Sequence, residues 1–155
     1  MDLDPEWEKK VVKKLLLEEE QKEEKKYPLN QISKMIKFKS LNQNKHFLRI
    51  LKKRRLNTRY FTIYFEKNLS NTKKDDNKNL KISFVVKKKI GNAVTRNKIK
   101  RKLKAAVQKV AKENQLIDLN YTYVIFGRNN VYKNKFPLIF SEVNDVFKRI
   151  KQIDN

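Results

Sequence analysis

Residues 87–104 place the strongest constraint on how this chain can fold, because they hold nine lysines and arginines and no acidic residue. Projected as a helix, the segment and its continuation have one apolar stripe of Ile99, Leu103, Ala106, Val107 and Val110. The opposite face carries Arg96, Asn97, Lys100, Arg101 and Lys104. Like charges one helical turn apart repel each other, so a merely solvated face normally mixes both signs. The pattern predicts a helix with one face in a hydrophobic core and the other against a polyphosphate.

The charge is distributed unevenly along the 155 residues. Residues 1–37 hold nine acids and nine bases, whereas residues 38–155 hold eight acids and thirty bases, which accounts for the net charge of +22. Nucleic acid or an anionic membrane is the natural counterion for such a body. Cysteine is absent and His46 is the single histidine, so disulfides, thiolate metal sites and histidine clusters are excluded, and we do not expect zinc chemistry or a catalytic histidine triad. No apolar run is long enough to span a bilayer, and we expect a soluble, cytoplasmic protein without a membrane partner.

The length favours one domain, residues 38–155, preceded by an extension of residues 1–37. Asp4-Pro5 predicts the start of a helix in the extension, and Tyr27-Pro28 predicts its end. Its narrow apolar stripe, which includes Trp7, either docks on the protein's own domain or binds a partner.

The pattern of residues 38–155 predicts further helices and strands, separated by polar connections. A short helix is expected at 42–51, and aromatic and β-branched runs predict strands at 60–65, 80–86 and 121–126. The polar segment 68–79 predicts a long hairpin loop. Pro137 opens a final helix with a buried stripe of Ile139, Phe140, Val143, Phe147 and Ile150.

Alternation within the first two of these strands predicts two different faces. Phe61, Ile63 and Phe65 share one face, as do Ile82, Phe84 and Val86 in the next strand. The other face combines Tyr60, Thr62 and Tyr64 with Lys81, Ser83, Val85 and Lys87. Such a face can stack bases and hold phosphates, or it can be the ordinary solvent side of an antiparallel sheet.

The basic segment resembles the bacterial ribonuclease P protein family, the small basic subunit of the ribonucleoprotein that trims the 5′ end of precursor tRNA. The family's motif runs from paired lysines through Gly-Asn-Ala-Val to Arg-Asn-Arg and a Lys-Arg pair. It is met here by Lys88-Lys89, Gly91-Asn92-Ala93-Val94, Arg96-Asn97-Lys98 and Lys100-Arg101. Lys98 stands in place of the motif's second arginine, and an ammonium cannot make the bidentate phosphate contact of a guanidinium.

The resemblance covers roughly residues 38–151 and implies a compact α+β fold. It implies a central mixed sheet packed by helices in the order α-β-β-β-α-β-α, with a left-handed crossover that carries the basic helix. The extension of residues 1–37 lies outside it.

The resemblance also implies two RNA-binding surfaces. The first would contact the catalytic RNA through Lys88, Lys89, Arg96, Asn97, Lys98, Lys100, Arg101 and Lys104. The second would be a cleft for the single-stranded 5′ leader of precursor tRNA, lined by Phe47, Leu51, Tyr60, Tyr64, Val85 and Lys87, with Lys89 also along the backbone. Leu51 stands where the family commonly has a second phenylalanine. As a subunit of the endoribonuclease, the protein would position the substrate, with hydrolysis left to the RNA and its Mg²⁺ ions; no catalytic residue, protein-bound metal, organic cofactor or small-molecule substrate is expected.

Two other functions remain open from the sequence. A ribosomal or general structured-RNA-binding protein without a processing role fits the composition equally well. A metal-dependent protein endonuclease would depend on Asp75 and Asp76, the only adjacent acids in the basic body, although turn chemistry in a lysine-rich loop explains them as well. His46 has no evident partner and is a weak catalytic candidate.

Overall fold

The computed structural model describes residues 10, 13, 36–68 and 79–153. The chain divides into two compact units, residues 1–34 and 35–155. In the first unit Lys10 and Lys13 are helical. The predicted stripe around Trp7 lies outside the described residues, as do Asp75, Asp76 and most of the predicted hairpin loop.

The second unit is built on one mixed sheet whose strand order is β1-β4-β5-β3-β2. Strand β4 runs parallel to β1 and β5, whereas β3 runs antiparallel to β5 and β2. The elements along the chain are β1 Lys37–Lys39, α2 Asn44–Ile50, β2 Arg54–Asn57, β3 Phe61–Lys67, β4 Asn79–Val86, the 3-10 turn η2 Lys88–Ile90, α3 Ala93–Glu113, β5 Tyr121–Gly127, α4 Asn129–Lys133 and α5 Phe136–Ile153. The predicted α+β class and the order of its main elements are confirmed.

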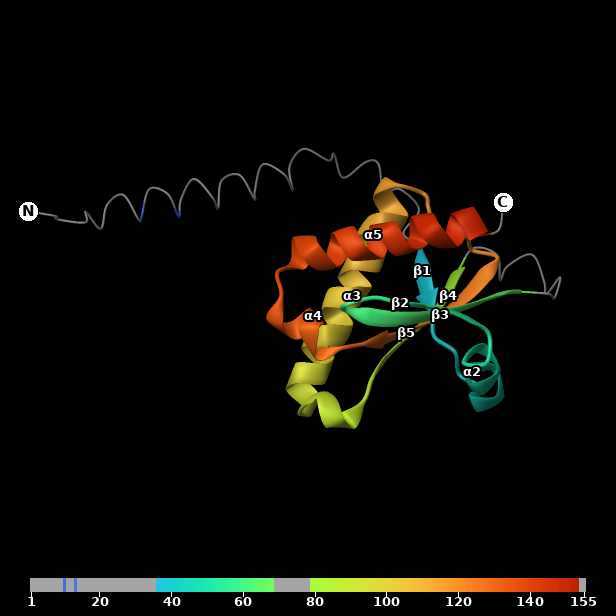
Figure 1. The fold of residues 1–155 in the computed structure, drawn as a ribbon, viewed down its shortest axis with the longest axis horizontal. Helices are drawn as coiled ribbons and strands as arrows, with labels where there is room; N and C mark the ends of the chain where they lie inside the picture. Colours follow the sequence, from blue (N-terminus) through green and yellow to red (C-terminus); the bar gives the residue numbers. More distant parts are fainter. Residues whose placement is uncertain (1–9, 11–12, 14–35, 69–78, 154–155) are drawn as a thin grey trace, which may run out of the picture. The chain divides into compact units, whose positions relative to one another are not determined.

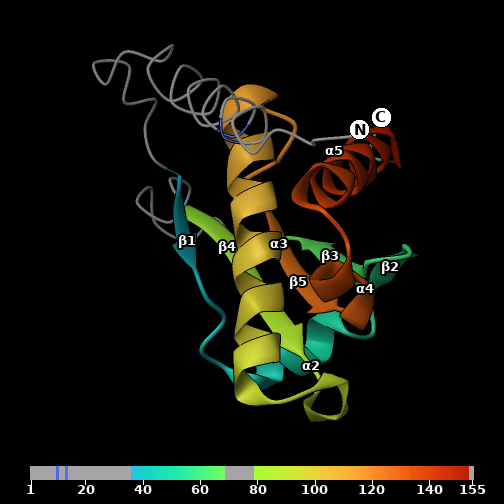
Figure 2. The same ribbon diagram turned by 90° about the vertical axis from the view of Figure 1, so that its left-hand side faces the viewer.

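Helices cover the two faces of the sheet unequally. In Figure 1, α5 lies on one side of the sheet and the short α2 on the other. Figure 2 shows the long α3 in front of the sheet, between β4 and β5, which it connects. The connection turns in the left-handed sense that the resemblance implied. The basic helix is therefore held by the sheet along one side and is open along the other.

The hydrophobic core lies between the sheet and the pair α3 and α5. The predicted apolar stripe of α3 is fully buried there, at 0% exposure for all five residues. Phe61, Ile63 and Phe65 of β3 face it from the sheet, as the alternation predicted. From α5, Ile139, Val143, Phe147 and Ile150 are buried, whereas Phe140 is half-buried and packs at the edge of the core.

Two elements, β1 and α4, lie outside the implied order, and β2, the first of its three successive strands, was not assigned to any residues by the sequence pattern. Strand β1 has three residues and exists through parallel pairing with β4, from Lys37↔Asn79 to Lys39↔Lys81; it spans the expected boundary between extension and domain at residue 37. Strand β2 begins in the basic run after α2 and pairs with β3. Helix α4 has five residues and is joined to α3 by Lys102, whose Nζ donates hydrogen bonds to the carbonyls of Val131, Tyr132 and Asn134 at 3.1, 3.3 and 2.8 Å.

Candidate nucleic-acid interface

The sheet face opposite the main core carries a cleft beside α2. Side chains on this face follow from the register, in which Thr62 pairs with Phe126, and Tyr64 with Val124. On the other flank of β5, Val85 of β4 pairs with Phe126. Helix α2 covers part of this face, where Ile50 and Val124 are buried apart from the main core. Leu41 covers Ser83 on β4, and a pocket opens beside α2 at the ends of β4 and β5.

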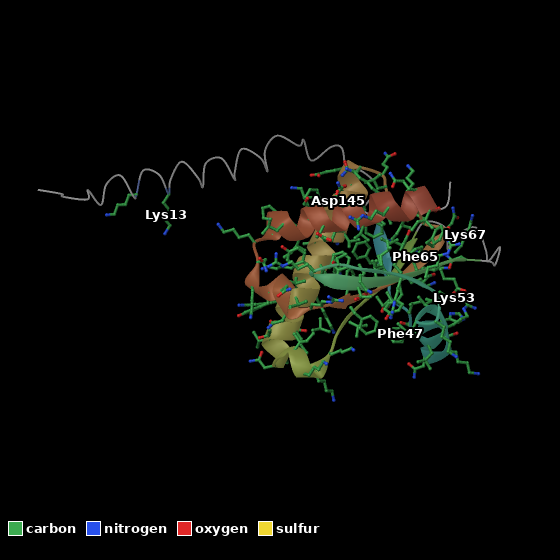
Figure 3. All side chains as sticks on the ribbon, viewed as in Figure 1. Lys13, Phe47, Lys53, Phe65, Lys67 and Asp145 are labelled. Atoms are coloured by element: carbon green, nitrogen blue, oxygen red, sulfur yellow. The ribbon has the colours of Figure 1, made fainter. Side chains whose placement is uncertain are left out.

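Ion pairs between α2 and the sheet help to position this helix. The Glu66 carboxylate accepts a hydrogen bond from Arg49 Nε at 3.0 Å and lies 3.5 Å from Lys53 Nζ. The Glu66 side chain is 11% exposed, whereas Arg49 and Lys53 are 56% and 49% exposed, so solvent partly screens both ion pairs. These ion pairs help to hold α2 against the sheet. Phe47 lies between α2 and the sheet, on the side opposite Phe65 (Figure 3).

Three aromatic rings line the region between α2 and the sheet. The Phe126 ring centroid lies 5.7 Å from that of Tyr64, edge to face, and 6.1 Å from that of Phe47 in a tilted arrangement. A pocket of about 450 Å³ opens beside them. Its lining comprises Leu51, Thr62, Tyr64, Lys87, Lys89, Ile90, Phe126, Gly127 and Arg128. The cleft thus combines π faces with an apolar wall.

Three cationic side chains border the same pocket. Lys87 and Lys89 come from the turn that connects β4 to α3, and both are exposed. Arg128 follows β5, and its Nη2 donates a hydrogen bond to Thr62 Oγ1 at 3.0 Å. The Thr62 hydroxyl in turn donates to Asn57 Oδ1 at 2.9 Å. Arg128 is therefore oriented at the cleft, with further N–H donors available to an anion.

The structure brings most of the predicted cleft residues together. Leu51, Tyr64 and Lys87 line the pocket, and Phe47 contacts its Phe126 wall. Val85 is half-buried beside Phe126 on the same face, although it does not border the pocket.

Tyr60 is not brought to the cleft, because it is 6% exposed and belongs to the main core. Tyr60 lies in a tight turn before β3, so its side chain does not follow the alternation of the strand. Thr58 Oγ1 accepts hydrogen bonds from the backbone N–H groups of Tyr60 and Phe61 and donates to the Phe61 carbonyl. The strand begins only at Phe61. Ser83 is also less open than the alternation implied, since its Oγ accepts the Leu41 N–H at 3.0 Å and the residue is 8% exposed.

The basic face of α3 is largely open and unneutralised. Asn92 caps the helix, with Oδ1 accepting the Thr95 N–H at 2.9 Å. Lys88, Lys89, Asn97, Lys98, Lys100, Arg101 and Lys104 are exposed and Arg96 is half-buried. In the part of the chain that the structure describes, none of these bases forms an ion pair with an acid. Uncompensated charge along one helix face favours a polyanionic ligand.

Two of these lysines also rest on aromatic rings. Lys98 Nζ lies 5.6 Å from the Tyr132 ring centroid, and Lys104 Nζ lies 5.8 Å from that of Phe38. Such contacts orient an ammonium group without neutralising it. Lys102, in contrast, uses its ammonium on the three carbonyls around α4 and is the structural lysine of this helix.

Sequence reasoning missed Phe126 and Arg128 as cleft residues. Alternation along β5 was a usable signal for Phe126, because it puts Thr122, Val124 and Phe126 on one face. The residues around Phe126 do not show that this face of β5 lines the cleft. That follows only from the pairing of β5 with β3, in which Val124 lies opposite Tyr64, some sixty residues earlier. The position of the Arg128 side chain at the cleft likewise depends on its hydrogen bond to Thr62, which the sequence does not reveal.

Two absences concern residues 36–68 and 79–153. This part of the chain holds no group of three or more His, Cys, Asp or Glu side chains placed to bind a metal ion. None of its helices has the length and apolarity needed to cross a bilayer. His46 is an exposed residue of α2.

The fold and its two surfaces define a class of protein, a small basic α+β domain with an exposed cationic helix and an aromatic cleft. A sequence model of the family described as Ribonuclease P matches residues 35–151. The ribonuclease P protein component of Carboxydothermus hydrogenoformans is 32% identical over 123 residues, which are 78% of this chain and 99% of the relative. That of Mesoplasma florum is 34% identical over 112 residues, 72% of this chain and 94% of the relative.

Solved structures agree with these sequence relatives. A Staphylococcus aureus RNase P protein mutant with defective mRNA degradation activity has a TM-score of 0.57 at 30% identity, with 72% of this chain and 87% of that chain covered. The RNase P protein from Thermotoga maritima has a TM-score of 0.52 at 26% identity, with 72% and 96% covered. This chain therefore belongs to the bacterial ribonuclease P protein family, the protein component of an endoribonuclease that processes tRNA.

Proposed function

We propose that this chain binds the catalytic RNA of ribonuclease P through α3 and holds the 5′ leader of precursor tRNA in the cleft beside α2. In this way it promotes removal of the leader and formation of the mature 5′ end. The observation that carries the proposal is the shared segment 87–92: Lys87 and Lys89 border the cleft, and Asn92 caps α3. One RNA held along α3 would thus lie close to a single strand held in the cleft.

The two surfaces suit different forms of RNA. The basic face of α3 offers charge without base-reading geometry, which suits the phosphates of a folded RNA. The cleft combines the rings of Phe47, Tyr64 and Phe126 with three cations, which suits an unpaired strand whose bases stack while its backbone is neutralised. Because every base has a π face, the cleft should accept leaders of many sequences.

Hydrolysis is assigned in this proposal to the catalytic RNA and its Mg²⁺ ions. The role left to the protein is to position the substrate and to screen the repulsion between two RNAs, both of which an array of lysines and arginines can provide.

Cleavage of a precursor tRNA at low Mg²⁺ tests the proposal directly. The reaction contains a bacterial ribonuclease P RNA, this protein, or both. Stimulation only when both are present supports the subunit role. Cleavage by the protein alone would instead support a protein endonuclease, and Asp75→Ala and Asp76→Ala would then be the first variants to make. Tight RNA binding without stimulation, repeated with the protein's own cognate RNA, would favour a general RNA-binding protein.

Tyr64→Ala separates the cleft from the basic helix. The variant should weaken binding of leader-bearing precursor more than binding of mature tRNA, because only the precursor reaches the cleft. Equal losses on both substrates would remove the leader cleft from the proposal while leaving the RNA-binding helix in place.

A further inference from the structure

We infer that Tyr132 on α4 is a stacking site for one unpaired base of the catalytic RNA, next to the basic face of α3. The inference rests on the proposed function, in which α3 holds that RNA through its phosphates. It adds a contact to a base, which phosphate binding does not supply. Tyr132 does not line the leader cleft.

The first argument is the surface around Tyr132. A single exposed tyrosine needs no explanation on a protein surface. Tyr132, however, is 42% exposed in a segment, residues 128–138, that holds one arginine and two lysines and no acidic residue. Leu138 in the same segment is 51% exposed. Exposed rings and apolar groups among cations are the combination with which proteins hold unpaired nucleotides.

The second argument is that the ring adjoins the basic face of α3. Helix α4 lies beside α3 in Figure 1, and Lys98 Nζ of α3 lies 5.6 Å from the Tyr132 ring centroid. Within the described part of the chain, Lys98 forms no ion pair with an acid. A phosphate bound by Lys98 would therefore lie close enough for a neighbouring base to reach the ring.

The third argument is that a fixed backbone carries the ring. Lys102 Nζ donates a hydrogen bond to the carbonyl of Tyr132 itself at 3.3 Å, and to those of Val131 and Asn134 at 3.1 and 2.8 Å. Val131 is fully buried next to Tyr132. Binding a base would thus order little more than one side chain, which keeps the entropic cost of the contact low.

The test measures binding of full-length variants to a bacterial ribonuclease P RNA over a range of salt concentrations. Tyr132→Leu keeps an apolar side chain but loses the π face, and it should bind the RNA about tenfold more weakly, a loss typical of one stacked base. The slope of log K against log salt concentration should equal that of wild type, because no cation is removed. Tyr132→Phe keeps the ring and should bind as wild type does.

The control is Ile153→Ala, which shortens another exposed apolar side chain at the far end of α5, where Ile153 is 47% exposed. This variant should bind the RNA as wild type does. Thermal unfolding of every variant checks that the fold is kept.

Photocrosslinking identifies the partner of the ring. The crosslinker p-benzoylphenylalanine is introduced in place of Tyr132, and in a second protein in place of Ile153, and each holoenzyme is assembled with precursor tRNA. Primer extension should map the crosslink from position 132 to an unpaired nucleotide of the catalytic RNA. Position 153 should give no crosslink at that nucleotide.

The outcomes distinguish the stacking site from the proposed function. If wild type does not bind the catalytic RNA, the proposed function itself fails. If wild type binds and Tyr132→Leu binds equally tightly, or if Tyr132→Phe loses as much affinity as Tyr132→Leu, the stacking site is refuted and the proposed function stands. A reduced salt slope in Tyr132→Leu would also refute stacking, because the ring would then act only by orienting Lys98. A crosslink confined to precursor tRNA or to base-paired nucleotides would refute the assigned partner.

Discussion

Gly127→Ala should destabilise this protein markedly, because α3 crosses the end of β5 at this glycine. A Cβ at residue 127 would lie 2.6 Å from Ile99 Cγ2, 2.9 Å from Leu103 Cδ1 and 3.3 Å from Val86 Cγ2. Carbon atoms pack at about 3.5–4.0 Å, so the first contact is about 1 Å too close. Ile99 and Leu103 are both 0% exposed and have no open space into which to move.

The expected change in the free energy of unfolding is the difference between two opposing effects. Overpacking of this kind costs about 3 kcal/mol when the neighbours are fully buried. Replacing glycine by alanine also restricts the unfolded chain, which offsets about 0.7 kcal/mol in an extended backbone that alanine tolerates. The net loss in the free energy of unfolding is about 2 kcal/mol. For a folded unit of this size that lowers Tm by roughly 8 °C.

Urea denaturation followed by circular dichroism measures the effect. The matched control is Gly91→Ala at the exposed start of α3, where the new Cβ would lie 3.2 Å from Thr95 and a small shift of the turn relieves the contact. We expect that variant to stay within about 0.5 kcal/mol of wild type, in the range of ordinary surface substitutions.

A double variant makes the reasoning refutable. Ile99→Ala alone should cost about 2–5 kcal/mol because it leaves a cavity. On that background Gly127→Ala should cost clearly less than in wild type, since the 2.6 Å contact is gone and Leu103 can shift from its 2.9 Å contact into the vacated space, so the two effects should be non-additive. Additive effects, or a Gly127→Ala protein as stable as wild type, would show that the close approach of α3 to β5 does not set the stability of this region.

Three further outcomes follow from the contacts. Lys102→Met should lower the free energy of unfolding by about 1–3 kcal/mol because three carbonyls lose a charged donor, without changing the salt dependence of RNA binding; a changed salt slope would place Lys102 on the RNA. Arg101→Ala should leave urea unfolding unchanged but reduce the slope of log K for RNA binding against log salt concentration by about one unit. A slope equal to that of wild type would show that this side chain does not contact the RNA. Glu66→Gln removes the ion pairs of this residue with Arg49 and Lys53, so α2 should be held less firmly. Filter binding should then show a loss of about 1 kcal/mol in the binding free energy of precursor tRNA and a smaller loss for mature tRNA. An equal loss for both tRNAs would mean that the position of α2 does not support the cleft.

Local periodicity predicted much of the fold and part of the site. The stripe of α3 from Ile99 to Val110 is buried as its spacing required, because the direction of a helical side chain is set by its position in the turn. The two faces of β3 follow from alternation in the same way, apart from Tyr60. The basic face of α3 could be identified because charge on a helix is visible in the sequence without knowledge of the tertiary structure.

Other features depended on contacts between distant residues. Strand β1 has no local signature and is stabilised by pairing with β4, forty residues later. Tyr60 is removed from the cleft by the hydrogen bonds of Thr58, which a two-residue alternation cannot anticipate.

Within a regular helix or strand, the order of the residues alone predicts which side chains share a face, and the charge on α3 can be counted in the same way. Which of these faces pack against one another depends on contacts between distant parts of the chain. Phe126 reaches Tyr64, and Arg128 reaches Thr62, through the pairing of β3 with β5. The reason is physical: side-chain direction follows from local backbone geometry, whereas strand register is decided by packing and hydrogen bonding summed over the whole sheet.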